Sequence, residues 1–120
     1  MKDYLSLDVR NVVLLGHSGA GKSTVGEACL HFTKAIDRMG KASDGTTALN
    51  FDADEGKRGL SCYCHLAPVE WKDKKINFID TPGYMDYEGE EVTGLTVGDN
   101  ALIVVDAKES LEAGTERAYK

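Results

Sequence analysis

The stretch that decides the fold of this chain is residues 11–24, which read NVVLLGHSGAGKST. Its first five residues form a short apolar run with two valines, and this composition predicts a strand that is buried on both faces. Residues 16–23 match the pattern G-x-x-x-x-G-K-[ST] at every fixed position. From Lys22 to about Met39, apolar residues recur three and four positions apart, which predicts a helix. The order strand, glycine-rich loop and helix is the context in which such a loop binds phosphate.

The chemistry of this loop follows from its residue types. Glycines let the backbone curl so that its N–H groups point at an anion, and the start of the following helix adds partial positive charge. Lys22 is predicted to reach the β- and γ-phosphates of a nucleotide, and the Ser23 hydroxyl to bind Mg²⁺. The alternative is a glycine-rich turn that only caps a helix, and the strand and helix around the loop disfavour it. The predicted phosphate-binding residues are Gly16, His17, Ser18, Gly19, Ala20, Gly21, Lys22, Ser23 and Thr24.

A second loop, Asp80-Thr81-Pro82-Gly83, follows an apolar stretch that is predicted to be a strand. An acidic residue at the end of a strand parallel to the first one is where a magnesium site needs it, and Asp80 is predicted to hold a metal-bound water. Gly83 can bring its backbone N–H close to a γ-phosphate because it has no Cβ. An ordinary β-turn around Pro82 is the alternative. The two loops together predict a nucleoside triphosphatase that senses the γ-phosphate.

The middle of the chain divides into a polar loop and a hairpin. Residues 40–58 carry turn-forming and charged residues without periodicity, so we expect a long loop that is functional or mobile. Residues 60–71 and 76–79 read as two strands joined by the polar turn 72–75, and they are predicted to pair in antiparallel fashion.

The last third of the chain is predicted to add a helix, a strand and the start of another helix. Residues 88–97 read as a helix with Val92 and Leu95 on its inward face. Residues 101–105 read as a second fully buried strand, and Thr115 is expected to open a further helix. Strands that alternate with helices predict an α/β fold, with a mostly parallel sheet and one antiparallel hairpin strand.

Length, charge and cysteine content exclude several classes of protein. A chain of 120 residues with 42% apolar residues fits one domain with a buried core. The 20 acidic residues against 14 lysines and arginines argue against broad nucleic-acid binding. Three cysteines are too few for a disulfide scaffold, so we expect no disulfide partner and an intracellular, reducing environment. No apolar run reaches the roughly 18 residues that a transmembrane helix needs, and we expect no membrane partner.

These motifs, in this order, resemble the GTPase domain of translational GTPases, above all elongation factor G and the elongation factor G-like proteins. The matching stretches are GHSGAGKST (16–24), KRGLS (57–61), LAPVEWKDKKINFIDTPGY (66–84), ALIVVDA (101–107) and GTERA (114–118). The resemblance implies a P-loop GTPase-type domain that binds GTP or GDP with Mg²⁺, in a cytoplasmic protein whose partner is the ribosome. It also implies that residues 40–61 are switch I and residues 80–97 are switch II.

The resemblance assigns roles to individual residues. The family's R-G-I-T segment matches residues 58–61, and its threonine, which closes over Mg²⁺ and the γ-phosphate, is Ser61 here. The family's D-T-P-G-H segment carries a histidine that positions the attacking water, and this chain has Tyr84 at that place. The implied catalytic set is Lys22, Ser61, Gly83 and Tyr84. The implied magnesium set is Ser23, Ser61 and Asp80, and the second nucleotide-binding segment is Asp80, Thr81, Pro82, Gly83 and Tyr84.

Several alternatives stay open at the level of sequence. The guanine-reading motif N-K-x-D does not occur before Lys120, so we expect the N-terminal part of a GTP-binding domain, truncated before the guanine-specificity motif. Preference for GTP over ATP then rests on the resemblance alone. The other readings are a ribosomal protection GTPase, a P-loop kinase or ATPase, and a catalytically weak nucleotide-binding module. Cys62, Cys64 and His65 read either as packed strand residues or as a metal site.

Overall fold

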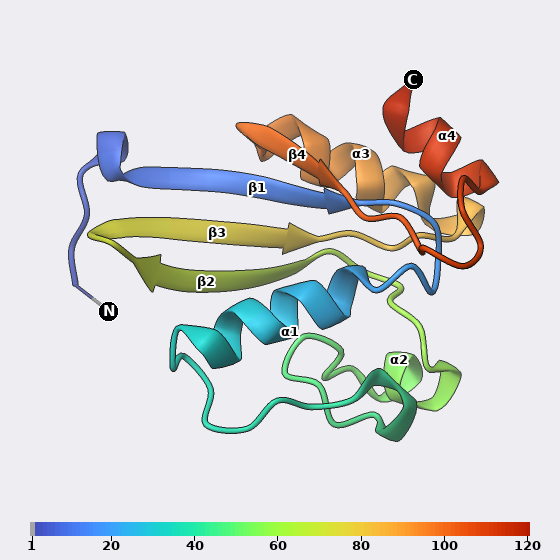
Figure 1. Cartoon of the computed structure of the whole chain (residues 1–120), viewed down its shortest axis with the longest axis horizontal. Coiled ribbons are helices and arrows are strands. Elements are labelled where there is room, and N and C mark those ends of the chain that lie inside the picture. Colours follow the sequence, from blue (N-terminus) through green and yellow to red (C-terminus); the bar gives the residue numbers. More distant parts are fainter. Residues whose placement is uncertain (1) are drawn as a thin grey trace.

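The computed structural model describes residues 2–120, and its centre is a four-stranded sheet in the order β2-β3-β1-β4. The strands are β1 (Val9–Leu15), β2 (His65–Trp71), β3 (Lys74–Asp80) and β4 (Asn100–Ile103). β1 pairs in parallel with both β3 and β4, whereas β2 pairs antiparallel with β3 (Figure 1). The prediction of a mostly parallel sheet with one antiparallel hairpin strand is therefore confirmed.

Helices cover the two faces of the sheet. α1 (Lys22–Phe32) packs on one face, where a Cβ at Gly26 would lie 3.6 Å from the Leu14 side chain. α3 (Glu88–Val97) packs on the other face, where a Cβ at Gly94 would lie 3.5 Å from Val13. Neighbouring residues of a strand point to opposite faces, so Leu14 and Val13 separate the two layers. Figure 1 shows α4 (Ala113–Tyr119) beside α3, and the short α2 (Ala53–Arg58) beyond α1.

The core consists of one apolar cluster on each face of the sheet. The cluster under α1 contains Leu30, Leu49, Ala67 and Val69, with Cys29, Ile36, Ile76 and Phe78 packed around it. The cluster under α3 and α4 contains Val13, Leu15 and Ile79, with Cys64, Ile103 and Ala118 around it. Since β1 contributes to the core and continues directly into the glycine-rich loop, the loop starts from a rigid support.

The hairpin is tighter than predicted. Its turn consists of Lys72 and Asp73 alone, because β3 already begins at Lys74. Both turn residues have positive φ, at 47° and 61°. Positive φ at both central positions is the geometry of a two-residue turn that matches the twist of the paired strands.

The helix α1 is shorter than predicted, because it ends at Phe32 and not near Met39. The Thr33 hydroxyl donates to a carbonyl one turn back at 2.8 Å, and Lys34 adopts a left-handed φ of 59°. A left-handed residue turns the chain out of a helix. Ile36 lies beyond this turn but still packs on the core, so the apolar spacing outlasts the helix.

The strand β2 begins at His65, so the prediction of a strand from residue 60 is wrong for residues 60–64. The backbone N–H groups of Cys62 and Cys64 donate to glutamate side chains at 2.7 and 2.9 Å. Side chains thus satisfy backbone groups that a strand would pair with its neighbour. The preceding polar loop also contains more structure than predicted, since it includes α2 and a 3-10 turn at Ala42–Asp44.

Two predictions of burial in the last third are wrong. Val92 and Leu95 of α3 are 54% and 44% exposed, and the helix instead turns Glu91 and Gly94 inward. A Cβ at Gly94 would lie 2.8 Å from the Thr81 side chain, so the missing Cβ lets the helix approach the sheet closely.

The strand predicted at residues 101–105 is also more exposed than expected. β4 spans Asn100–Ile103, and Leu102 is 43% exposed. The physical reason is position, because β4 is the edge strand of the sheet formed by residues 2–120, with a neighbour on one side only.

Within residues 2–120, no helix is both long and apolar enough to cross a bilayer.

Candidate functional site

The glycine-rich loop between β1 and α1 adopts a conformation that depends on its glycines. Gly16, Gly19 and Gly21 have φ values of 136°, 83° and 101°, which residues with a Cβ rarely adopt. A Cβ at Gly16 would also lie 2.4 Å from the Val104 carbonyl oxygen. Gly21 caps the N-terminus of α1, so the helix begins at Lys22 and directs its free N–H groups into the loop.

The Lys22 side chain fills the space under this loop. It is 6% exposed, and its Nζ donates to the carbonyl oxygens of Gly16 and His17, both at 2.9 Å. Burial lowers the pKa of Lys22, and the nearby carboxylates of Asp80 and Glu91 act in the opposite direction. Two of the three donor hydrogens of the ammonium group are therefore used by the loop, and one is left for another acceptor.

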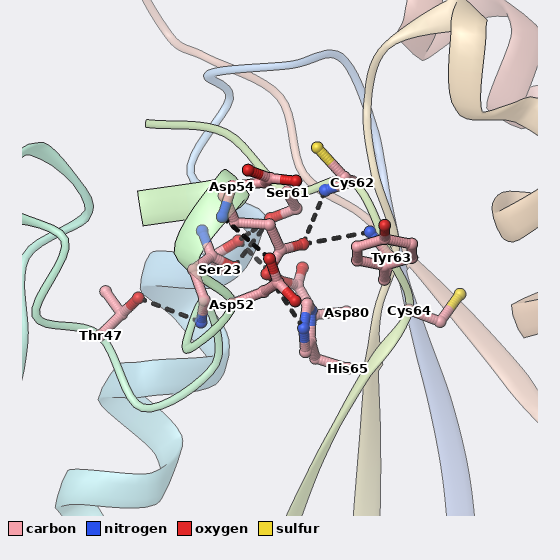
Figure 2. Close-up of polar contacts among 12 residues, drawn as sticks. Ser23, Thr47, Asp52, Asp54, Ser61, Cys62, Tyr63, Cys64, His65 and Asp80 are labelled. Atoms are coloured by element: carbon pink, nitrogen blue, oxygen red, sulfur yellow. Dashed lines mark hydrogen bonds and ion pairs between the residues drawn. The ribbon is translucent and has the colours of Figure 1, made fainter. Parts of the chain in front are cut away.

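Three oxygen donors from different elements meet beside the loop. The Ser23 hydroxyl of α1 donates to Asp80 Oδ2 at 2.5 Å and lies 3.1 Å from Ser61 Oγ (Figure 2). The Asp80 side chain is fully buried at the end of β3, and its Oδ1 has no hydrogen-bond partner among the described residues. Burial raises the pKa of Asp80, while the bond from Ser23 and the charge of Lys22 oppose this shift.

This donor set fits a hard divalent cation. Carboxylate and hydroxyl oxygens are the ligands that Mg²⁺ prefers, and the free Oδ1 of Asp80 offers a buried acceptor. All three residues predicted as the magnesium set, Ser23, Ser61 and Asp80, lie together in the structure.

The second predicted loop packs directly on the first. The Thr81 hydroxyl donates to the Leu14 carbonyl oxygen at 2.7 Å, and Pro82 is fully buried. A Cβ at Gly83 would lie 2.4 Å from Lys22 Nζ and 2.5 Å from the backbone nitrogen of Ser18. The backbone of residue 83 therefore lies against the glycine-rich loop at a distance that only glycine allows.

These elements enclose a polar pocket of about 130 Å³ between the glycine-rich loop and residues 40–61. Its walls come from the loop, from the 40–61 segment and from residue 83. The lining residues are Ser18, Gly19, Gly21, Lys22, Ser23, Thr24, Ala42, Asn50, Gly59, Leu60, Ser61 and Gly83.

Several predicted site residues do not line this pocket, namely Gly16, His17, Ala20, Asp80, Thr81, Pro82 and Tyr84. His17 turns toward α4, where its Nδ1 accepts from the Gly114 N–H at 3.3 Å and its Nε2 lies 3.4 Å from Glu112 Oε1. Its side chain thus ties the glycine-rich loop to the start of α4. Tyr84 is 45% exposed and lies just outside the packed part of the second loop.

Three residues that the sequence analysis did not single out organise the 40–61 segment. Asn50 is buried, and its Oδ1 accepts from the Ser61 hydroxyl at 3.0 Å. Glu27 of α1 is buried and accepts from the N–H groups of Gly40 and Ala48 at 2.9 to 3.1 Å. The third is Glu55 of α2. The available signal for Glu27 was its place one turn before Leu30 on the inward face of the helix, where a charged residue requires partners.

The cysteines do not form a metal site in the structure. Cys62 is buried, the Cys64 thiol donates to the Glu90 carbonyl oxygen at 2.8 Å, and Cys29 packs beside the core. All three cysteines are free, and residues 2–120 contain no cluster of three or more His, Cys, Asp or Glu side chains arranged to hold a metal ion. The interpretation of these cysteines as packing residues agrees with their surroundings.

The fold and the two packed loops define a P-loop domain of the GTPase type. Residues 7–120 match the elongation factor Tu GTP binding domain, and the chain belongs to this family of translational GTPase domains. The family predicted from the sequence motifs is therefore confirmed.

Two curated proteins are similar to this chain over most of its length. The chain is 40% identical over 112 residues to an elongation factor G-like protein of Mycobacterium tuberculosis, and 38% identical over 112 residues to elongation factor G 2 of Streptomyces coelicolor. Both matches cover 93% of this chain and 16% of the relative, so the chain spans about a sixth of their length.

Solved structures also superpose on this chain. A crystal structure of a Thermus thermophilus protein superposes with a TM-score of 0.89 at 35% identity, over 92% of this chain and 17% of that one. A bacterial selenocysteine-specific elongation factor superposes with a TM-score of 0.71 at 22% identity, over 92% of this chain and 17% of that one, which supports the fold alone.

Proposed function

We propose that this domain binds GTP with Mg²⁺ and hydrolyses it to GDP and phosphate, as part of a translation factor of the elongation factor G type. The observation that carries this proposal is that Lys22, Ser23, Ser61 and Gly83 line one polar pocket, while the buried Asp80 accepts a hydrogen bond from Ser23. Membership of the GTP-binding family and the elongation factor G names of two relatives support it.

The phosphate chain is the part of the nucleotide that this site is built to hold. The backbone N–H groups of residues 16–24 and the N-terminus of α1 supply a concave positive surface. Lys22 adds its remaining N–H donor toward the β- and γ-phosphates. The Gly83 N–H is the proposed donor to a γ-phosphate oxygen, and the closeness of the Gly83 backbone to the Lys22 ammonium supports this role.

The hydroxyls of Ser23 and Ser61, together with the carboxylate of Asp80, would hold Mg²⁺. The ion neutralises charge that develops on the phosphate oxygens. In this arrangement Ser61 responds to the γ-phosphate side of the nucleotide, so residues 40–61 act as switch I and residues 80–97 as switch II.

Tyr84 occupies the place at which the family positions the attacking water. Its phenol can donate or accept a hydrogen bond but brings no positive charge near neutral pH. This favours a second candidate function, a nucleotide-binding module with weak catalysis that needs a partner for hydrolysis. The partner in the proposal is the ribosome, in the cytoplasm, and a ribosomal protection GTPase is the remaining alternative of the same family.

A single-turnover assay on the full-length protein tests the proposal. Radiolabelled GTP and ATP are compared, each with and without ribosomes, for the wild type and for Lys22→Ala. We expect hydrolysis of GTP but not of ATP, stimulation by ribosomes, and loss of both in the variant. Equal use of ATP would contradict the guanine assignment, and binding of GTP without turnover under all conditions would favour the weak module.

A further inference from the structure

We infer that Glu55 is a positioning residue, which holds the segment carrying Ser61 so that the Ser61 hydroxyl lies beside Ser23 and Asp80. The inference rests on the proposed function, because it gives Ser61 its role at the magnesium site. It concerns a residue outside the pocket, since Glu55 does not line the pocket walls.

Glu55 makes its contacts directly behind Ser61. Its side chain is 0% exposed, and its Oε1 accepts from the backbone N–H groups of Cys62 at 2.7 Å and of Tyr63 at 3.1 Å. These are the first two N–H groups after Ser61. Residues 60–64 belong to no strand, so this carboxylate replaces the sheet as the support of the segment.

The short helix α2 explains how Glu55 reaches back to a later part of the chain. Asp52 caps its N-terminus by accepting from the Asp54 N–H at 2.9 Å. Gly59 ends it with a left-handed φ of 65°, and its N–H donates to the Glu55 carbonyl oxygen at 2.8 Å. This glycine turn reverses the chain, and the residues that follow then run past the Glu55 side chain.

The second oxygen of Glu55 faces the start of β2. His65 Nε2 lies 3.1 Å from Oε2, and the Phe51 ring packs edge-on against the imidazole with centroids 5.3 Å apart. Figure 2 shows Cys62, Tyr63, Cys64 and His65 in succession along this segment, with Ser61 beside Ser23. One oxygen of the carboxylate is thus hydrogen-bonded to the segment, whereas the other lies close to His65 without a hydrogen bond among the described residues.

On the other side of Ser61, its hydroxyl is held within the 40–61 segment by a hydrogen bond to Asn50. Glu27 supports the same segment at Gly40 and Ala48, far from Ser61 along the chain. Glu55 is therefore the buried side chain that fixes the backbone next to Ser61. If the Glu55 side chain is shortened, the N–H groups of Cys62 and Tyr63 lose their acceptor, and the Ser61 hydroxyl is then free to leave the site.

The test separates reach from charge in the full-length protein. Glu55→Asp keeps the charge and shortens the side chain, whereas Glu55→Gln keeps the reach and an acceptor oxygen. Asp54→Asn is the matched control, because Asp54 is an exposed carboxylate of the same helix. Binding of a non-hydrolysable GTP analogue and of GDP is measured for each variant by titration at fixed Mg²⁺.

We expect Glu55→Asp to weaken the GTP analogue about tenfold, as the loss of one to two hydrogen bonds implies. GDP binding changes less than about twofold, because Ser61 acts on the γ-phosphate side of the site. Glu55→Gln and Asp54→Asn stay close to the wild type. In a Ser61→Ala background the effect of Glu55→Asp on the GTP analogue disappears, which a general structural role would not produce.

The outcomes distinguish this inference from the proposed function. A wild type that binds neither nucleotide overturns both. A wild type that binds GTP overturns this inference alone if Glu55→Asp weakens GDP and the GTP analogue equally. The same holds if the effect of Glu55→Asp persists undiminished in the Ser61→Ala background, or if Glu55→Gln is as weak as Glu55→Asp.

Discussion

The backbone of Gly83 lies against the ammonium group of Lys22, so that a Cβ at position 83 would fall 2.4 Å from Nζ. The same Cβ would fall 2.5 Å from the Ser18 backbone nitrogen, an atom that cannot move without the loop. This contact joins the two loops that the sequence motifs mark, across more than 60 positions of the chain. It makes residue 83 a sensitive probe of whether the two loops act together on one phosphate group.

We expect Gly83→Ala to weaken binding of a non-hydrolysable GTP analogue about tenfold or more, roughly 1.4 kcal/mol, because the methyl group pushes the second loop away from Lys22. Isothermal titration measures the affinity. Gly89→Ala is the matched control, since a Cβ at that position of α3 meets nothing within 4 Å. An affinity of Gly83→Ala equal to that of the control would contradict the close contact of the two loops.

Lys22→Ala is expected to abolish nucleoside triphosphate binding. The substitution removes the buried ammonium that faces the proposed phosphate site and leaves the carbonyl oxygens of Gly16 and His17 without their donor. Fluorescence titration with a labelled GTP analogue gives the affinity, and circular dichroism reports whether the fold survives. Lys108→Ala is the control, because that lysine is exposed. An unchanged affinity of a folded Lys22→Ala protein for the GTP analogue would contradict the assignment of this loop as a phosphate site.

Residues 40–60 of the 40–61 segment are expected to exchange their amide hydrogens faster without GTP and Mg²⁺ than with them. Its apolar anchors are few, and Ser61 joins it to the site only through a hydroxyl. Hydrogen–deuterium exchange with mass spectrometry follows the segment in both states, with β1 and β3 as internal references. Slow exchange that does not depend on the ligand would show that this segment is not a switch.

Tyr84→His is expected to raise the rate of GTP hydrolysis, or to leave it unchanged. The site is half-exposed, so the imidazole fits without repacking, and it can orient a water molecule. A tenfold gain corresponds to about 1.4 kcal/mol of barrier, a reasonable size for positioning of a water. Single-turnover rates with ribosomes measure the effect, and a large loss of activity would mean that the phenol has its own role.

Cys64 is expected to resist alkylation in the folded protein. Burial, followed by the nearby Glu90 carboxylate, raises the pKa of Cys64 to about 11. At pH 8 its thiolate fraction is then about a hundredfold lower than that of a thiol with its ordinary pKa, and the thiolate is the reactive form. Iodoacetamide labelling followed by mass spectrometry compares native with denatured protein. Equally fast labelling in both states would show that the thiol does not keep its bond to the Glu90 carbonyl oxygen.

Much of the fold was predictable because its signals are local. The strand and loop of residues 11–24, the hairpin and the helix at 88–97 each follow from periodicity, glycine spacing and turn residues within one segment. The meeting of Ser23, Ser61 and Asp80 followed from the order of the motifs and the family resemblance.

The remaining features depend on contacts between distant segments. α3 turns Gly94 inward, where it lies against Thr81. The spacing of apolar residues in the helix does not predict this inward face. The end of α1 at Phe32 depends on a single left-handed residue, Lys34, although the apolar spacing runs on. The edge position of β4 makes Leu102 half-exposed, a property of the sheet rather than of the strand.

The type of site could be predicted from one short stretch of chain, because a loop of this kind requires its glycines, lysine and serine in fixed order. How the rest of the chain is held against that loop depends instead on contacts between distant segments. Glu27 and Glu55 look like surface residues in a charged sequence, yet each is buried and accepts backbone hydrogen bonds from the 40–63 region. A carboxylate is stable in such a place only where folding brings N–H donors to it, and those donors come from other segments of the chain.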